Sequence, residues 1–254
     1  MYGAIIGDLS GSTYEYEQTK SIKSIKTDRL ITDLSFYSDD TILTIAVLDA
    51  ILNDKDYDRF LKYYISKYKN YKPNFNPYFE TSFSPNIIKW SESNETGYSK
   101  GNGALMRVSP VGYLFHNEKD VKENAEYATI PSHCSLEAIE YAVKLSLMIY
   151  YFRNKMSKEE VYKLLKIEPK YIPFDKFNTK CAETFNNCAY VIYNSNSFED
   201  SIKNTLLMGG DTDTNACIVG SVAESIYGID DYLIDEANKK IPHEFVKILN
   251  KVYK

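Results

Sequence analysis

Long apolar runs with polar residues at their ends dominate the pattern of this chain. Thr41–Leu52 is almost entirely apolar, which predicts a buried helix, although its β-branched residues also fit a strand. Leu136–Phe152 is apolar over a length too great for a typical strand. Tyr57–Tyr68 is amphipathic, as expected for a helix that packs on a core. These three segments favour a helical protein.

Helix-start signals predict further helices. Ser157 with Glu160 has the spacing of a capping box, and Ser197 with Asp200 predicts a similar start for a helix that runs to position 208. The last helix is predicted over Glu244–Val252.

One predicted helix is rich in small residues. Asp213–Tyr227 contains Gly220, Ser221 and Ala223, which would let another helix approach closely. Hairpin signals are almost absent from the chain. We therefore predict an all-α fold, a compact single-domain helical bundle that comprises residues 1–254. The segment Lys69–Pro85, rich in Asn, Pro and aromatic residues, predicts a long and functional loop.

Composition narrows the classes of protein that need to be considered. The net charge of -5 argues against a stable nucleic-acid partner. The start of the chain has no basic leader, and no apolar run approaches ~18 residues, so neither a signal peptide nor a membrane span is expected. The four cysteines form no C-x-x-C pair, which makes a zinc site improbable and predicts buried thiols in a reducing compartment. We expect a cytoplasmic protein, and nothing in the pattern requires an oligomer.

Two acidic clusters each precede an apolar segment. Ser38-Asp39-Asp40-Thr41 comes before the first buried run, and Gly210-Asp211-Thr212-Asp213-Thr214 comes before the small-residue helix. Helix capping explains one oxygen in each cluster, but adjacent carboxylates repel unless a cation compensates them. Oxygen donors without His or Cys favour a hard ion such as Mg²⁺, and four carboxylates could hold two ions ~3.5–4 Å apart. Because the spacing does not show that the clusters meet, capping and metal binding both stay open.

Three further motifs carry candidate chemistry. Gly7–Glu15 contains two glycines that indicate tight packing or a turn near a ligand, and Glu15 by itself could be a surface residue. Gly101–Arg107 is a glycine-rich loop that enters an apolar segment, an arrangement that suits phosphate but also occurs for backbone reasons. Ser132–Ser135 contains His133, and a lone histidine there is more often a capping or packing residue.

These five motifs, in this order, resemble those of the ADP-ribosylglycohydrolase family, which includes the dinitrogenase-reductase-activating glycohydrolase. The matching segments read GDLSGSTYE, SDDT, GNGALMRVSPVG, SHCS and GGDTDTNACIVGSVAESIYG, and the resemblance runs from Gly3 to about Gly228. Ser38 departs from the family pattern, which usually has Thr, but it keeps the hydroxyl.

The resemblance implies an all-α fold and an enzyme that uses two Mg²⁺ ions, or Mn²⁺, to cleave the C1″ glycosidic bond of an ADP-ribosylated substrate and release ADP-ribose. The residues that match family metal ligands are Ser38, Asp39, Asp40, Asp211, Asp213 and Thr214. Those that match catalytic residues are Glu15, as general acid or base, with Asp39 and Asp40. Those that match the substrate-binding segment are Gly101, Asn102, Gly103, Ala104 and His133.

Other parts of the resemblance are less specific. It implies a structural role for Arg107 and a supporting or packing role for Asp8. The G-S-x-Y-E form of the first motif is more similar to the serine-linked branch than to the arginine-linked branch. Aromatic residues of Tyr71–Phe83 could stack on adenine or simply pack.

Two other functions fit the same residues. A two-metal nucleotide phosphohydrolase also uses clustered acids, although such enzymes usually show E-x-x-E or H-D spacings, and release of phosphate would identify it. A non-catalytic ADP-ribose-binding protein would bind ADP-ribose without turnover. The filled ligand positions and Glu15 argue against the second alternative.

Overall fold

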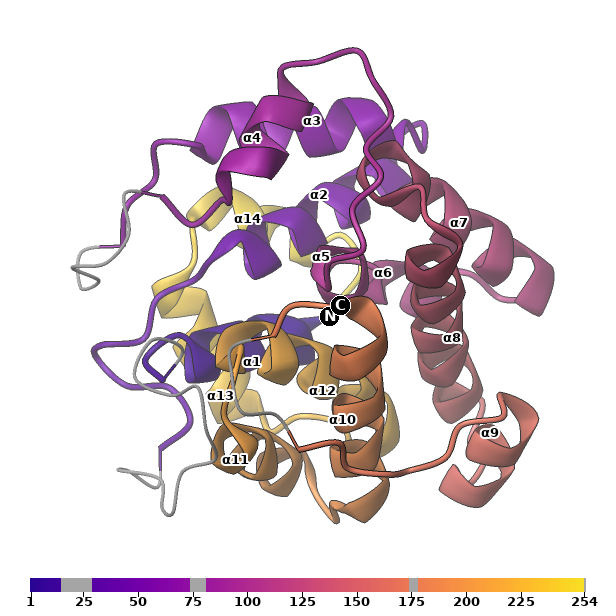
Figure 1. The fold of residues 1–254 in the computed structure, drawn as a ribbon. Helices are drawn as coiled ribbons and strands as arrows, with labels where there is room; N and C mark the ends of the chain where they lie inside the picture. Colours follow the sequence, from indigo (N-terminus) through magenta and orange to yellow (C-terminus); the bar gives the residue numbers. More distant parts are fainter. Residues whose placement is uncertain (15–28, 74–80, 174–177, 254) are drawn as a thin grey trace.

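The computed structural model describes residues 1–14, 29–73, 81–173 and 178–253, and these residues form an all-α fold, as predicted (Figure 1). The helices are α1 (Tyr2–Gly11), α2 (Asp39–Leu52), α3 (Tyr57–Tyr68), α4 (Pro85–Ser91), α5 (Gly103–Met106), α6 (Ser109–Leu114), α7 (Glu118–His133), α8 (Leu136–Arg153), α9 (Lys158–Leu164), α10 (Cys181–Asn194), α11 (Phe198–Met208), α12 (Thr212–Tyr227), α13 (Asp231–Lys240) and α14 (His243–Leu249). In the described ranges, β-structure is limited to two isolated bridges. None of the described helices combines the length and the apolar character of a membrane span.

Helices α1 and α12 lie side by side at the centre of the fold (Figure 1). Gly3, Gly7 and Gly11 fall on one face of α1, because residues four apart stack on the same side of a helix. A Cβ on Gly3 would lie 2.1 Å from the carbonyl oxygen of Gly220, and a Cβ on Gly7 would lie 2.0 Å from that of Ala216. The glycines therefore mark tight helix packing rather than a turn, and Gly220 admits the close approach predicted for it.

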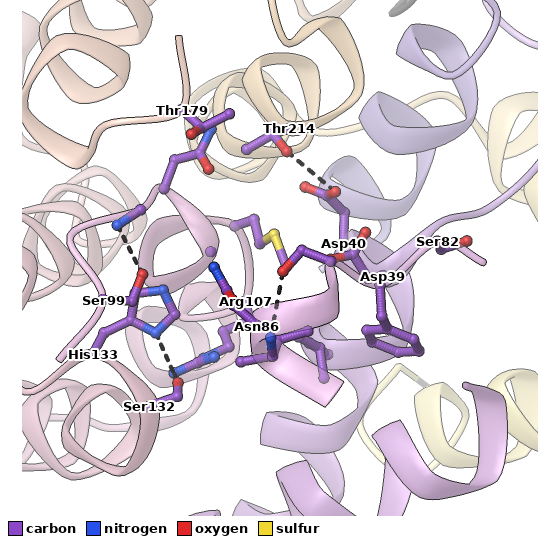
Figure 2. A pocket seen from close by; sticks show the side chains of 18 of the residues that line it. Asp39, Asp40, Ser82, Asn86, Ser99, Arg107, Ser132, His133, Thr179 and Thr214 are labelled. Carbon is purple, nitrogen blue, oxygen red and sulfur yellow. Dashed lines mark hydrogen bonds between the residues drawn. The ribbon is translucent and has the colours of Figure 1, made fainter. Parts of the chain in front are cut away.

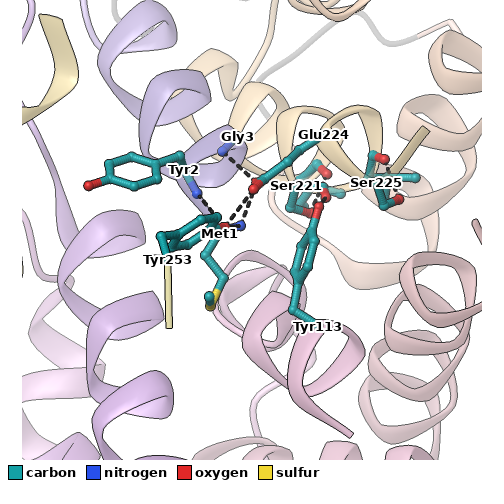
Figure 3. Close-up of polar contacts among 10 residues, drawn as sticks. Met1, Tyr2, Gly3, Tyr113, Ser221, Glu224, Ser225 and Tyr253 are labelled. Carbon is teal, nitrogen blue, oxygen red and sulfur yellow. Dashed lines mark hydrogen bonds and ion pairs between the residues drawn. The ribbon is translucent and has the colours of Figure 1, made fainter. Parts of the chain in front are cut away.

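Polar contacts join the N-terminus of α1 to the C-terminal part of α12 (Figure 3). The Glu224 carboxylate pairs with the ammonium group of Met1 and accepts a hydrogen bond of 2.8 Å from the amide of Gly3. The Tyr253 hydroxyl donates to the same carboxylate, and the Tyr113 hydroxyl donates to the carbonyl of Ser221 at 2.8 Å. A carboxylate beside the first amides of a helix is favourable because the helix dipole is positive there. These contacts fix the end of the α1–α12 pair that lies away from the acidic clusters.

The remaining helices cover this central pair. Helices α2 and α3 pack together on one side, α7 pairs with α8 on another, and α10 and α11 pack against α12 (Figure 1). The apolar run at the start of α2 is fully enclosed: Ile42, Leu43 and Ile45 are at most 1% exposed. The run forms helix α2, so the alternative of a strand is excluded. Buried polar residues lie at the N-termini of α2 and α12, among them Asp40 and Asp213.

Helix boundaries confirm most of the sequence predictions. Helix α3 has the predicted bounds, and α9 begins with a complete capping box formed by Ser157 and Glu160. Helix α11 begins after Ser197, whose side chain accepts from the amide of Asp200. The predicted long loop ends where α4 begins at Pro85, and its described parts, 69–73 and 81–84, contain no helix.

The four cysteines are free, and all but one of them are buried. Cys181, Cys188 and Cys217 are enclosed by the bundle, whereas Cys134 is partly exposed. The prediction of buried thiols is confirmed for these three and is wrong for Cys134.

A candidate metal centre at the base of a cleft

The two acidic clusters meet at the N-termini of α2 and α12. The Thr214 hydroxyl donates a hydrogen bond of 3.2 Å to Oδ2 of Asp40, although 174 positions separate the two residues (Figure 2). Oxygen atoms of Asp8, Asp40 and Asp213 lie within 4.8 Å of one another, and all three side chains are buried. The spatial meeting that the spacing could not show is therefore present in the fold.

Capping accounts for only part of each cluster. Ser38 is the N-cap of α2, and its hydroxyl accepts from the Asp40 amide at 3.2 Å. Asp211 occupies the N-cap position of α12 but makes no side-chain cap. Its carboxylate accepts a hydrogen bond of 2.7 Å from the side-chain amide of Asn102. One serine is enough to cap α2, so the remaining carboxylates have no structural explanation as caps.

Asp8 supports the start of α2 from the central helix α1. Its carboxylate accepts from the amide of Ser38 at 2.9 Å and from the amide of Thr41 at 3.1 Å, and also from both hydroxyl groups. The resemblance implied only a supporting or packing role for Asp8, and the structure places this carboxylate among those that face Asp40. The signal in the sequence was the G-D pair at the start of the first motif.

The buried carboxylates of the cluster are compatible with a cation, because without one their charged forms are disfavoured. Burial raises the pKa of Asp8 to about 6, against the hydrogen bonds that it accepts. Burial and the nearby charges of Asp8 and Asp211 raise the pKa of Asp39 to about 8, and the pKa of Asp40 is raised well above its usual value for the same reasons. In the described part of the chain, no Lys or Arg pairs with Asp8, Asp39, Asp40 or Asp211.

The donor set fits a hard divalent ion. Oδ1 of Asp40 is buried and has no hydrogen-bond partner, which costs free energy unless a further ligand takes it up. The surrounding donors are carboxylate and hydroxyl oxygens, and such oxygens are the ligands that Mg²⁺, Mn²⁺ and Ca²⁺ prefer. The residues present therefore fit a metal centre of the kind implied by the resemblance.

A cleft of about 930 Å³ opens over the acidic residues. This volume is typical of a site for a small molecule. Figure 2 shows Asp39, Asp40, His133 and Thr214 in this cleft. Its lining also includes Asp211, Asp213, Gly101, Asn102, Gly103 and the aromatic residues Phe83 and Trp90. Ala104 is buried in α5, directly after the part of the loop that reaches the cleft. Most of the sequence-predicted site residues therefore share one cavity.

The glycine-rich loop uses part of its hydrogen-bonding capacity within the protein. The Gly101 amide donates to Oγ of Ser99 at 3.1 Å, and the Asn102 amide donates to the carbonyl of Thr179 at 2.7 Å. The amides of Gly103 and Ala104 begin α5 and have no acceptor inside that helix. Of the predicted backbone donors, the amides of Gly101 and Asn102 are therefore already used within the protein. The side chain of Asn102 orients the carboxylate of Asp211.

The predictions for Glu15 and for the aromatic residues of the long loop have different outcomes. Glu15 lies outside the described residues, so its predicted role as general acid or base stays a prediction. Tyr71 stacks on Tyr37 with ring centroids 4.3 Å apart, which makes it a packing residue. Phe83 is the aromatic residue of the described loop that reaches the cleft, and Trp90 joins it from α4, a contribution the sequence did not predict.

Comparison with known proteins identifies the family of this chain. The family model of the ADP-ribosylglycohydrolases matches residues 1–251. The ADP-ribosylhydrolase ARH3 of Danio rerio is 24% identical over an alignment of 308 positions, which covers 91% of this chain and 82% of that protein. The ADP-ribosylarginine hydrolase Tri1 of Pseudomonas putida (strain GB-1) is 23% identical over 158 residues, which cover 56% of this chain and 42% of Tri1.

A solved structure shares the fold over nearly the whole chain. It is described as an ADP-ribosylglycohydrolase-related protein complex, and it superposes with a TM-score of 0.68 at 18% identity, covering 97% of this chain and 89% of that one. The motifs, the fold and the family match lead to the same assignment. This chain belongs to the ADP-ribosylglycohydrolase family of hydrolases.

Proposed function

We propose that this protein is a metal-dependent hydrolase that cleaves the C1″ glycosidic bond of an ADP-ribosyl group and releases ADP-ribose. The observation that carries the proposal is the contact between Thr214 and Asp40, which brings two acidic clusters together at the base of a large cleft. Family membership supports the same chemistry.

The metal centre would hold two Mg²⁺ ions, or Mn²⁺. The residues that would provide its oxygen ligands are Ser38, Asp39, Asp40, Asp211, Asp213 and Thr214. When bound, the ions would orient substrate oxygens and offset the charge that develops during hydrolysis. Asn102 contributes indirectly, because its amide holds the Asp211 carboxylate in one orientation.

Other residues of the cleft would bind the remainder of the substrate. The amide of Gly103, which lines the cleft and has no acceptor inside α5, can donate to a phosphate oxygen. Phe83 and Trp90 give the cleft an apolar wall that suits a purine ring. Glu15 would exchange a proton with the leaving group or with water as the bond breaks.

The direct test is a release assay over a panel of ADP-ribosyl linkages, with Mg²⁺ and with a chelator. The panel comprises serine, arginine, acidic side chains, nucleic-acid bases and a small ADP-ribose derivative, because the name of one relative specifies arginine and the name of another specifies no linkage. We expect metal-dependent release of ADP-ribose from at least one linkage. Phosphate release instead would support the phosphohydrolase alternative, and tight ADP-ribose binding without turnover would support the binding-protein alternative.

Matched variants test which carboxylates are needed for turnover. Asp39→Ala and Asp213→Ala should abolish turnover, because each removes a carboxylate from the centre. Asp49→Ala is the control on the same helix: its carboxylate accepts from the Tyr64 hydroxyl and lies outside the cleft lining. If Asp49→Ala were as inactive as Asp39→Ala, loss of turnover would reflect the stability of α2 rather than a metal site.

Glu15→Gln tests the proton-transfer role. It should leave ADP-ribose binding unchanged and remove most of the rate, because an amide keeps the shape of the side chain but cannot exchange a proton. A near-normal rate on the best substrate would refute this role.

We further propose that the protein acts in the cytoplasm as a monomer, without a membrane or a stable nucleic-acid partner. The support is its charge of -5 and its four unpaired cysteines. Light scattering coupled to size exclusion should give a mass near 29.2 kDa, and a mass twice as large would contradict the monomer.

A further inference from the structure

Arg107 is an arginine buried beside the cleft without a counterion. The side chain is 1% exposed, and no carboxylate in the described ranges pairs with its guanidinium. Its Nε and Nη1 have no partner, whereas Nη2 donates to the carbonyl of Ala128 at 3.1 Å and to Oγ of Ser132 at 2.8 Å. Burying an unpaired charge costs free energy, so a purely structural role is a poor explanation for it.

Ser132 lies between Arg107 and His133 and forms a hydrogen bond with each of them. Because a guanidinium can only donate, the contact with Arg107 uses a lone pair of the Ser132 oxygen and leaves the hydroxyl proton free to point elsewhere. Nδ1 of His133 lies 2.7 Å from the same oxygen (Figure 2). A hydroxyl oxygen has two lone pairs, so the direction of this contact depends on the tautomer of the ring. Because no other acceptor for the Ser132 hydroxyl proton lies within hydrogen-bond distance in the described part of the chain, the contact favours donation to Nδ1, which then acts as an acceptor. A neutral imidazole whose Nδ1 accepts carries its proton on Nε2.

The Nε2 atom of His133 faces the glycine-rich loop. A Cβ on Gly103 would lie 3.3 Å from Nε2, and one on Gly101 would lie 3.9 Å from it, so the two glycines leave room in front of the ring. Nε2 has no hydrogen-bond partner in the described part of the chain, and His133 lines the cleft. Burial and the positive charge of Arg107 hold the pKa of His133 well below its usual value, which keeps the ring neutral.

We propose that Arg107 and Ser132 are positioning residues that hold His133 as the Nε2-protonated tautomer, so that its ring donates a hydrogen bond to a phosphate oxygen of a nucleoside diphosphate in the cleft. This inference rests on the proposed function for the identity of the ligand, since ADP-ribose carries such a diphosphate. Histidine would then be a neutral donor and not an acid or a base.

The tautomer is measurable by ¹⁵N NMR of the ligand-free protein. The chain has three histidines, so His116 and His243 provide internal references. We expect Nε2 of His133 to give the signal of a protonated nitrogen and Nδ1 that of an acceptor. Ser132→Ala should produce a mixture of tautomers, and Ser132→Thr, which keeps the hydroxyl, should restore the native signals. A native His133 protonated on Nδ1 would overturn the inference.

The effect on the ligand is measured by calorimetric titration with ADP-ribose in a double-mutant cycle. Ser132→Ala should weaken binding about tenfold, which corresponds to about 1.4 kcal/mol. In a His133→Ala background the same change should cost less than about twofold, because Ser132 acts through the ring. Equal losses in both backgrounds would show that Ser132 affects binding by some other route and would overturn the proposal.

Two control variants test whether the effects come from the hydrogen bonds among Arg107, Ser132 and His133 or from a general loss of stability. Ser201→Ala removes another buried hydroxyl, one that donates at 2.7 Å to a carbonyl of its own helix, and should leave the His133 signals and ADP-ribose affinity unchanged. Arg107→Met should mix the tautomers if it folds, and unchanged His133 signals in a folded Arg107→Met protein would remove Arg107 from the proposal. Where it does not fold, the Ser132 variants carry the test. Because the NMR measurement needs no turnover, it stands even if no ADP-ribosyl linkage proves to be a substrate.

Discussion

Gly7→Ala is the perturbation that most sharply tests why the acidic residues meet. Gly7 lies in the middle of α1, directly before Asp8, where α1 crosses α12. A Cβ added there would lie 2.0 Å from the oxygen and 2.3 Å from the carbon of the Ala216 carbonyl. Real Cβ contacts are essentially never shorter than 3.0 Å, so the two helices would have to separate locally by about 1.0 Å.

Two opposing effects set the magnitude. Alanine is favoured over glycine inside a helix by about 1 kcal/mol, which alone would stabilise the variant. Overpacking a close-packed interior costs about 1–3 kcal/mol, and the upper end applies to Gly7 because the clashing atoms are backbone and cannot rotate away. The net expectation is a loss of about 2 kcal/mol. For a chain of this size, that corresponds to a fall in Tm of about 4–8 °C.

The assay is thermal and denaturant unfolding of Gly7→Ala beside the native protein, with Mg²⁺ affinity measured on both. Affinity should also fall, because displacement of α1 moves the carboxylate of Asp8 relative to that of Asp213. Gly228→Ala is the control: a Cβ there meets nothing within 4 Å, and only its backbone conformation, with φ of 77° and ψ of −172°, makes alanine unfavourable, by about 1–3 kcal/mol. That variant should keep its Mg²⁺ affinity. A Gly7→Ala protein as stable as the native protein, or more stable, would refute the account of the helix crossing.

Three further predictions follow from the same geometry. In a chelator, Tm should fall as the pH rises from about 5 to 8, because the carboxyls of Asp8 and Asp39, with folded pKa values of about 6 and 8, hold their protons more tightly than in the unfolded chain. Mg²⁺ should remove this dependence of Tm on pH. A Tm that does not change with pH in chelator would contradict the raised pKa values. Asn102→Ala should weaken Mg²⁺ binding by about 10–100-fold in a calorimetric titration, since Asp211 loses its orienting donor; unchanged affinity would leave Asn102 without this role. A thiol reagent should modify Cys134 in the native protein long before the buried cysteines, and equally fast modification of all four would show that the bundle opens readily.

Most of the helical architecture could be predicted from local patterns. Capping residues located the starts of α9 and α11, because a serine side chain that accepts from the third helical amide acts within one turn. Helix α1 was not predicted, since its three glycines lower helix propensity and no side chain caps its start. Its stability comes from packing against α12, which no local window contains. Helix α7 includes Pro131, which likewise obscured the pattern.

The residue types of the site were predictable, but their arrangement was not. Adjacent acids before apolar runs made a cation site one of two interpretations, because repulsion between neighbouring carboxylates is a local property and capping explains only part of each cluster. The contact between Asp40 and Thr214 depends on the crossing of α1 with α12 and on the packing of α2, which are tertiary facts. The same holds for Arg107 and Ser132, which are 25 positions apart and meet only in the fold.

The central claim is that the acids of α2 and α12 jointly hold a pair of divalent ions. The most direct measurement is an anomalous difference map from crystals grown with Mn²⁺. The proposed two-ion centre predicts two peaks ~3.5–4 Å apart between Asp40, Asp211 and Asp213, absent from crystals of Asp213→Ala. A map with no peak between the two helices, or with ions bound to only one cluster, would contradict the claim.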